Sequence, residues 1–231
     1  MTTDDAGPRA SVYQRALGSK FAELSPALQR YFGEIPAGHV GVGEGVYDIV
    51  GSRYRRRAAS LLRWSARHEV LFPEIGRDIP FVIENRPLTG RLAGSRWFGF
   101  PGRVRVMRDT MHTAGDEIVE RLGRRGGLEV RLTPRVEDGG MVLRSRELAW
   151  RVRGIRVPLP RVAAVEVRES EDPAEAGRER VDVRLRMLLL GEVFRYSGSF
   201  AYRIVPEDDT VAAVSPALPT LSMWLTQNFP H

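Results

Sequence analysis

Several residue types are scarce in this chain of 231 residues, and each scarcity excludes a class of protein. The absence of cysteine excludes disulfides, thiolate metal sites and cysteine nucleophiles, and it is compatible with a reducing compartment. No apolar run approaches the ~18 residues that a membrane-spanning helix needs. The first ten residues are acidic and polar, unlike the basic and then apolar start of a secretory signal. We therefore expect a soluble, cytoplasmic protein.

Lysine is nearly absent too, because Lys20 is the only one and 34 of the 35 basic residues are arginine. Two interpretations stay open: a GC-rich bacterial genome favours arginine codons, and a phosphate-binding surface would select arginine for its forked donors. The arginines are scattered among acidic residues instead of forming one tract. This scatter disfavours nucleic-acid binding although the net charge is +6.

The motifs of cofactor-dependent enzymes are also missing. No nucleophile elbow, phosphate-binding loop or kinase signature occurs. The glycines at 41, 43 and 45 lack the strand before and helix after that a dinucleotide fingerprint requires, so they indicate a glycine-rich edge strand or bulge. None of the four histidines has the spacing of a metal site: His39, His68, His112 and His231. We expect no bound cofactor and no metal.

The dominant pattern in the sequence is an alternation of apolar and polar residues. Between residues 179 and 205 it runs through two segments that are joined by a turn near Gly191. Period two predicts two long, half-buried strands with one apolar and one charged face. The apolar face of the second strand is rich in aromatic residues: Phe194, Tyr196, Phe200 and Tyr202.

The same alternation recurs from Ile79 onward and predicts a series of antiparallel strands. Residues 137–140 indicate a hairpin, residues 169–179 indicate a hairpin loop, and residues 11–32 have helical spacing. So many antiparallel strands must close into a barrel or wrap around a helix. We expect an α+β, mostly antiparallel β domain over residues 1–231, either a curved sheet or a β-barrel, lipocalin-like or helix-grip-like, with flanking helices. Residues 1–10 are expected to be disordered, and residues 206–231 to form a C-terminal extension with a short helix.

Residues 53–70 have the pattern of a basic amphipathic helix. Its apolar stripe includes Leu61 and Leu62, and arginines flank it. One interpretation is a helix that covers the sheet with its arginines solvated. The other is a helix that docks on an anionic membrane surface, with Trp64 at the interface.

Three polar residues are candidates for acid–base catalysis. Glu84 interrupts an apolar strand, where either it or Asn85 must point inward, and a buried carboxylate would have a raised pKa. Asp109 and His112 are close in sequence at a predicted strand end, where such a pair could exchange protons, although a solvated loop is the alternative. Aromatic residues are the expected ligand-binding residues of an enclosed cavity: Phe81, Trp97, Phe98, Trp150, Phe194, Tyr196 and Tyr202.

These features favour a protein that binds a hydrophobic small molecule in an apolar, aromatic-lined cavity. Such a cavity could promote a cyclisation, isomerisation or related rearrangement without a cofactor, since holding a reactive conformer lowers a barrier by up to ~7–11 kcal/mol. The alternative is a non-catalytic accessory module that binds lipid, an anionic membrane surface or a protein partner through residues 53–70. The sequence leaves open whether the protein is an enzyme.

The last third of the chain carries a glycine before an L-P-R stretch, an acidic strand, a D-V strand that leads to a glycine, and a closing Y-x-G-x-aromatic. The positions are Gly154, Leu159, Pro160, Arg161, Glu166, Asp182, Val183, Gly191, Tyr196, Gly198 and Phe200. Together they resemble the domain-of-unknown-function 4166 family, whose opening helix is similar to residues 21–33. The resemblance implies a β-rich bacterial domain, found alone or fused to reductase-like domains, and implies no activity. Residues 71–112 and those after Val205 depart from the family, and we expect any specific function in 71–112.

Overall fold

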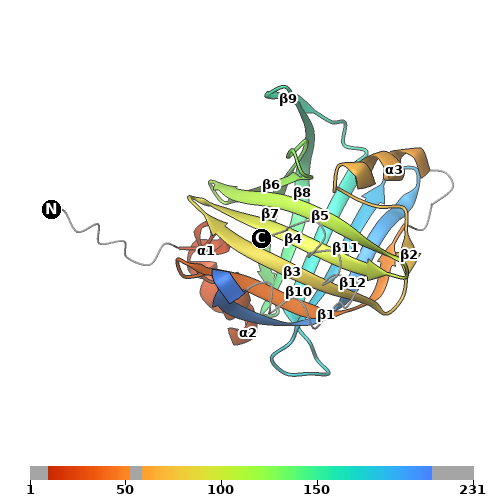
Figure 1. Cartoon of the computed structure of the whole chain (residues 1–231). Helices are drawn as coiled ribbons and strands as arrows, with labels where there is room; N and C mark the ends of the chain where they lie inside the picture. Colours follow the sequence, from red (N-terminus) through yellow and green to blue (C-terminus); the bar gives the residue numbers. More distant parts are fainter. Residues whose placement is uncertain (1–9, 53–58, 210–231) are drawn as a thin grey trace.

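The computed structural model describes residues 10–52 and 59–209, in which ten strands form a closed antiparallel barrel (Figure 1). The strands follow the order β10-β11-β12-β1-β3-β4-β5-β6-β7-β8, and β8 pairs with β10 to close the ring. Two short strands, β2 and β9, pair with β1 and β8 outside the ring. The predicted fold class is confirmed as a lipocalin-like barrel with few helices.

The strands have the following bounds: β1 His39–Gly51, β2 Ile75–Gly76, β3 Ile79–Leu88, β4 Arg91–Phe100, β5 Arg103–Ala114, β6 Glu117–Leu122, β7 Leu128–Glu137, β8 Gly140–Val152, β9 Ile155–Pro158, β10 Ala163–Glu171, β11 Glu179–Met187 and β12 Gly191–Pro206. Both predicted hairpins are confirmed. Asp138 and Gly139 have φ of 52° and 75°, as a two-residue turn with two left-handed positions requires. The loop between β10 and β11 is shorter than the predicted 169–179: it spans residues 172–178, because residues 169–171 end β10 and Glu179 begins β11.

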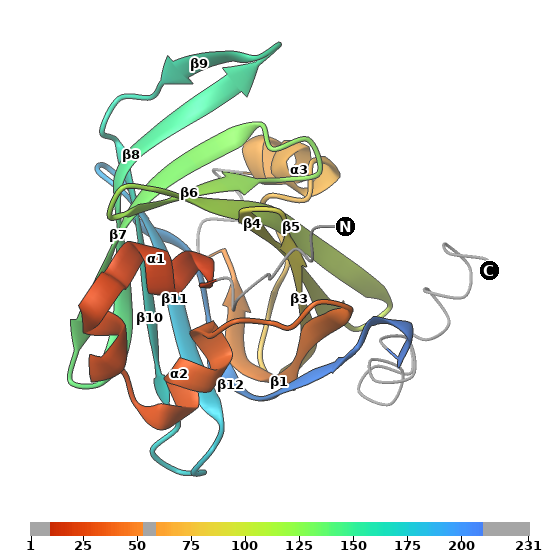
Figure 2. The ribbon, with the colours of Figure 1, turned by 90° about the vertical axis from the view of Figure 1, so that its left-hand side faces the viewer.

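Helices lie at both ends of the barrel (Figure 1). One end carries α1 (Val12–Leu17), η1 (Gly18–Glu23) and α2 (Pro26–Phe32), which lie across the mouth of the barrel in Figure 2. Ser11 begins α1 with a reciprocal capping box to Gln14, and Ser25 caps α2. The other end carries α3 (Ala59–Arg67).

Three predicted segments lie partly or wholly outside the described residues. The helix predicted over residues 53–70 is confirmed for 59–67, and residues 53–58 lie outside the described part. The predicted disorder at residues 1–10 and the predicted C-terminal helix also fall outside it. At the described C-terminal end, β12 stops at Pro206 and a single 3-10 turn follows at Glu207–Asp209.

The core fills the inside of the barrel, because the alternation of each strand turns one set of side chains inward. Aromatic rings dominate it: Tyr47 stacks on Phe81 with ring centroids 3.6 Å apart, and Phe72 packs edge-on against Phe98 at 4.9 Å. The period-two pattern of β12 is confirmed, since Phe194, Tyr196 and Phe200 are all buried.

The glycine-rich strand β1 lies within the ring, paired with β12 on one side and β3 on the other, so the edge alternative was wrong. The other alternative, a bulge, is present in β1 between Tyr47 and Ile49, where the register with β12 shifts. Its glycines make room for side chains of the neighbouring strands. A Cβ on Gly41 would lie 1.6 Å from Tyr202 Oη, and a Cβ on Gly43 would lie 2.5 Å from Ile83 Cγ2. The glycine run is therefore a packing feature of the interior.

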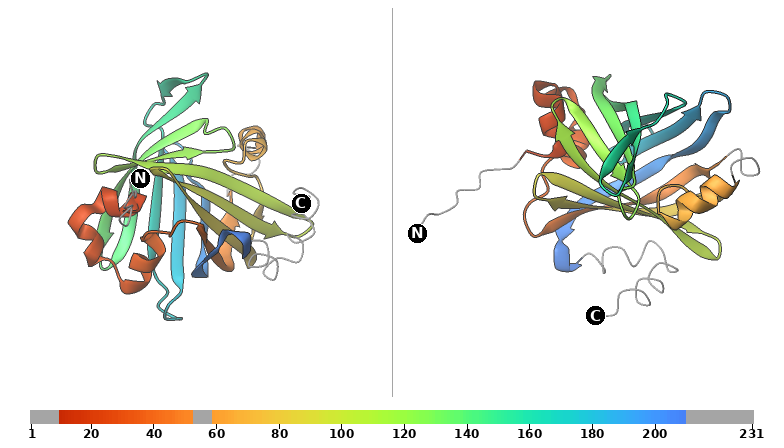
Figure 3. Two further views of the ribbon diagram at one scale, coloured as in Figure 1. Left: turned by 60° about the vertical axis from the view of Figure 1, so that its left-hand side comes forward. Right: turned by 90° about the horizontal axis from the view of Figure 1, so that it is seen from above.

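Many of the arginines form ion pairs across strands on the outer surface. The Arg144 guanidinium lies 3.0 Å from Glu137 and 2.9 Å from Glu166, and that of Arg156 lies 2.7 Å from both Glu129 and Glu147. Each exposed pair contributes little by itself, about 0–1 kcal/mol. Beyond the ring, β8 and β9 form a hairpin that stands out from the barrel, here named the wing, residues 150–158 (Figure 3).

Candidate functional site

The barrel encloses a cavity of about 100 Å³. Most of its wall consists of aliphatic and aromatic side chains on the strands. Tyr13 and Tyr31 contribute from the helices at one end, and Val70 and Leu71 contribute just after α3 at the other. The volume far exceeds the ~10–15 Å³ that one water needs.

An ion pair crosses the interior between β4 and β5. The Arg96 guanidinium donates to the Asp109 carboxylate, whose side chain is only 1% exposed. In the sheet register Asp109 faces Gly94, and a Cβ there would lie 2.8 Å from Asp109 Oδ1. Gly94 therefore provides the space that the buried carboxylate occupies.

Two further acidic residues, Glu120 on β6 and Glu169 on β10, line the cavity. Burial raises the pKa of Glu120 to about 8, and the nearby charge of Asp109 adds to the effect while Arg96 opposes it. Burial likewise raises the pKa of Glu169 to about 8, with Arg96 opposing and Glu179 and Glu120 adding. Both carboxyl groups therefore hold a proton near neutral pH and are able to donate hydrogen bonds.

Three buried carboxyl oxygens inside the barrel have no hydrogen-bond partner among the described residues. They are Oδ1 of Asp109, Oε2 of Glu169 and Oε2 of Glu179. Buried polar atoms are normally satisfied, because leaving one without a partner costs about 1–3 kcal/mol. The interior thus offers unused hydrogen-bonding capacity beside an apolar wall.

The helical end of the barrel separates this cavity from a larger outer groove of about 1030 Å³. The groove lies between the helical segment and the β3–β4 hairpin, and Tyr13 and Tyr31 line both hollows. The Tyr13 hydroxyl donates to Met111 Sδ at 3.3 Å, and the Tyr31 ring packs edge-on against Tyr202 at 4.8 Å. These two tyrosines form the wall between groove and cavity.

The three predicted catalytic residues do not come together. Asp109 is inside the barrel, bound to Arg96. Of the two adjacent polar residues, Asn85 is buried and Glu84 is not; Glu84 pairs with Arg86 at 3.1 Å and does not line the cavity. His112 lies three residues from Asp109 and is absent from the cavity wall; partial burial and the charge of Arg121 lower the pKa of its imidazole.

The predicted ligand-binding aromatics divide into two groups. Three of them line the cavity, namely Phe81, Phe194 and Tyr196. The other four lie elsewhere: Phe98 packs in the core beside the cavity, Tyr202 lies against Tyr31, Trp97 belongs to a separate buried cluster with Val82, and Trp150 contacts Trp64 of α3. Trp97 points outward because its neighbours on β4, Arg96 and Phe98, point inward.

Three charged residues of the cavity wall were not predicted as site residues from the sequence: Arg96, Glu120 and Glu169. A signal for all three was present in the alternation. Arg96 shares its face with Phe98, Glu120 lies between Ile118 and Leu122, and Glu169 continues the face of Val167. A charged residue at an inward position of a period-two strand marks a polar group in the interior.

The fold and interior define a class of protein, namely a closed antiparallel β-barrel that buries an aromatic cluster and charged side chains around an internal cavity. The family model described as "Domain of unknown function (DUF4166)" matches residues 24–200, and the chain belongs to this family. The predicted family resemblance is thereby confirmed. Among described residues no helix is long and apolar enough to cross a membrane, and no three His, Asp or Glu side chains are arranged to hold a metal ion.

Similarity extends to individual proteins and solved structures. The chain is 28% identical over 202 residues to the uncharacterized protein YndH of Bacillus subtilis (strain 168), which covers 83% of this chain and 96% of that protein. It also aligns with the crystal structure of the dehydratase domain of RzxB from Pseudomonas fluorescens, at 9% identity, over 75% of this chain and 80% of that one. The TM-score of that alignment is 0.15, which supports no inference about fold or activity.

Proposed function

We propose that the barrel interior binds a small, mostly apolar molecule that carries a neutral, oxygen-containing group. The observation behind this proposal is the enclosed cavity, whose wall combines Phe81, Phe194 and Tyr196 with the acidic side chains of Glu120 and Glu169. Apolar pockets with a few convergent polar groups are the usual form of small-molecule sites.

The volume limits the size of the ligand. An apolar cavity of about 150 Å³ admits benzene, so about 100 Å³ suits a molecule of a single ring or smaller. A larger ligand requires the wall to move, and Tyr13 and Tyr31 are the residues whose rotation would join the cavity to the outer groove.

The charges limit its polarity. Arg96 and Asp109 neutralise each other, and Glu120 and Glu169 are neutral near pH 7. An unpaired charge would be costly in this interior, whereas a carbonyl or hydroxyl oxygen can accept a hydrogen bond from a protonated carboxyl group. A neutral ligand is therefore favoured over an anion.

We further propose that Glu120 and Glu169 exchange protons with such a ligand. A carboxyl group with a pKa of about 8 is close to the pH at which general acid–base catalysis works best. The class of reaction that fits is a proton-transfer isomerisation or cyclisation of a carbonyl compound without a cofactor. Asp109 would act as a positioning residue that holds Arg96.

Small ring compounds that differ in charge test the binding proposal. Cyclobutanone and cyclobutanol, which are smaller than benzene, are expected to raise the Tm of the protein and to give a saturable signal in calorimetry, while cyclopropanecarboxylate at the same concentration does neither. Val183→Phe, which fills the cavity, is expected to remove the effect. Val152→Phe makes the same change at an exposed position outside the cavity, and this variant is expected to bind the neutral compounds as the wild type does. The proposal fails if the neutral compounds leave the wild-type Tm unchanged, or if Val183→Phe binds them as well as Val152→Phe.

A further inference from the structure

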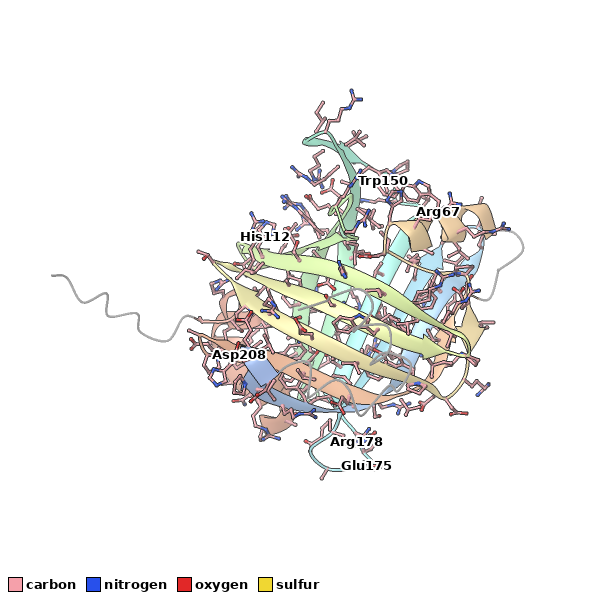
Figure 4. All side chains as sticks on the ribbon, viewed as in Figure 1. Arg67, His112, Trp150, Glu175, Arg178 and Asp208 are labelled. Atoms are coloured by element: carbon pink, nitrogen blue, oxygen red, sulfur yellow. The ribbon has the colours of Figure 1, made fainter. Side chains whose placement is uncertain are left out.

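The α3 end of the barrel joins three segments that are far apart in the sequence. The first is residues 63–68, which comprise the last part of α3 and the residue that follows it. The other two are the β6–β7 loop at 123–127 and the wing. The Arg124 N–H donates to the His68 carbonyl at 3.1 Å, and the Arg151 N–H donates to the Gly127 carbonyl at 2.8 Å. The rings of Trp64 and Trp150 are in edge-on contact at 5.3 Å. Figure 4 labels Arg67 and Trp150 at this end, where α3 and the base of the wing are neighbours.

These three segments carry more positive charge than the neighbouring acidic residues balance. They contain no aspartate or glutamate. Arg151 and Arg156 of the wing pair with Glu129, which lies outside these segments. Five other arginines here are exposed and have no ion pair within residues 10–52 and 59–209: Arg63, Arg67, Arg124, Arg125 and Arg153. The scattered arginines of the sequence therefore form a cluster only in the folded protein.

Large apolar side chains are exposed among these arginines. On α3 and the wing, Trp64 is 43% exposed, Val152 58% and Ile155 68%. The β11–β12 turn adds Leu188 and Leu189, at 77% and 93% the most exposed large apolar residues described. This turn adjoins the chain that leaves the wing, because the Leu188 N–H donates to the Val162 carbonyl at 2.8 Å.

We propose that this surface, residues 63–68, 123–127, 150–158 and 188–189, binds the surface of an anionic lipid bilayer. Unpaired arginines attract anionic headgroups, and protruding aliphatic side chains with a tryptophan insert at the boundary between headgroups and acyl chains. Nucleic acid would engage the arginines but leave Ile155 and Leu189 in water. The proposal is independent of the cavity and of any ligand in it.

Cosedimentation of the full chain with vesicles tests the proposal. The protein is expected to bind vesicles of phosphatidylcholine mixed with phosphatidylglycerol and not those of pure phosphatidylcholine, and added salt weakens the binding. The triple variant R124S/R125S/R153S is expected to lose about 100-fold in partitioning, at about fivefold per arginine. The pair I155S/L189S also weakens binding, without changing its salt dependence.

A second triple variant, K20S/R91S/R135S, is the matched control. It removes the same charge from exposed cations outside these segments that have no ion pair among the described residues, and it is expected to bind like the wild type. Circular dichroism confirms that each variant is folded. Equal binding to both kinds of vesicle, or equal losses in the two triple variants, would overturn the proposal. So would unchanged binding by R124S/R125S/R153S, or a stronger affinity for duplex DNA than for anionic vesicles.

Discussion

Glu169 allows a direct measurement of how well the barrel interior excludes water. The residue lies on β10, is 9% exposed, and burial raises its pKa from 4.5 to about 8. Between these pH values the folded protein holds a proton that the unfolded chain has released. The free energy of unfolding therefore falls as pH rises: the contribution is fully present below pH 4.5 and lost by about pH 8. At ~1.4 kcal/mol per pH unit, the whole loss approaches about 5 kcal/mol.

The substitution Glu169→Gln keeps the shape of the side chain and removes its titration. Urea unfolding of the wild type and of the variant across about pH 6 to 9 gives the free energy of unfolding of each. As the pH rises from about 6 to 9, we expect the free energy of unfolding of the wild type to fall by about 3 kcal/mol relative to that of the variant. The reason is that only the wild type has a buried proton at residue 169 to release. The contribution of Glu120 is present in both proteins and largely cancels in the difference.

Glu166→Gln on the same strand is the control. Glu166 is ion-paired to Arg144 at 2.9 Å, and hydrogen bonds from Arg168 and Arg144 lower its pKa. The unfolded and folded states are therefore both ionised above about pH 6, and the difference from wild type is expected to stay constant up to pH 9. Parallel pH curves for Glu169→Gln and the wild type would show that Glu169 is ionised in contact with water, and the argument for an enclosed, neutral cavity would be refuted.

Three further predictions concern the packing around the cavity. Asp109→Ala is expected to lower the free energy of unfolding in urea by about 3–5 kcal/mol, because it leaves Arg96 buried and unpaired. The double variant R96L/D109L is expected to recover most of this loss. Equal losses in the single and the double variant would contradict a buried ion pair. Gly41→Ala is expected to lower the Tm, since its Cβ would lie 1.6 Å from Tyr202 Oη, and the double variant G41A/Y202A is expected to melt at a higher temperature than G41A does. Ser11→Ala removes the cap of α1 and should cost about 1 kcal/mol by urea unfolding, accompanied by faster hydrogen exchange in that helix; unchanged exchange would argue against the capping box.

The strands of the barrel were predictable because their signal is local. Alternation in β7, β11 and β12 and the turn residues at 137–140 each depend on neighbours within a few positions, and the structure confirms them. The glycines of β1 were assigned to an edge strand or a bulge because a glycine-rich strand has few side chains to pack. The reason for the run is the size of Tyr202 and Ile83 on the adjacent strands, which lie about 40 or more positions away along the chain.

The candidate site was less predictable than the fold. Glu84 was chosen as a polar interruption of an apolar strand, but a strand has two faces and a neighbour one position away reverses the assignment, as Asn85 does for Glu84. His112 was chosen for its nearness to Asp109, but an odd separation of three positions places the two side chains on opposite faces of β5. The interior charges were visible as inward positions in their own strands. The sequence did not show that these charged residues line one cavity, because Arg96, Glu120 and Glu169 come from β4, β6 and β10.

By itself the sequence determined an antiparallel, two-faced β protein without cysteine chemistry, because composition and alternation act over short distances. Only the tertiary structure decided two things. Closure of β8 on β10 turned the apolar faces into one cavity and brought Arg96, Glu120 and Glu169 into its wall, with Asp109 paired to Arg96. Folding also gathered Arg63, Arg124 and Arg153 with Ile155 at one end of the barrel. Both depend on contacts between residues remote in the chain, whose positions are fixed by the register of the closed sheet.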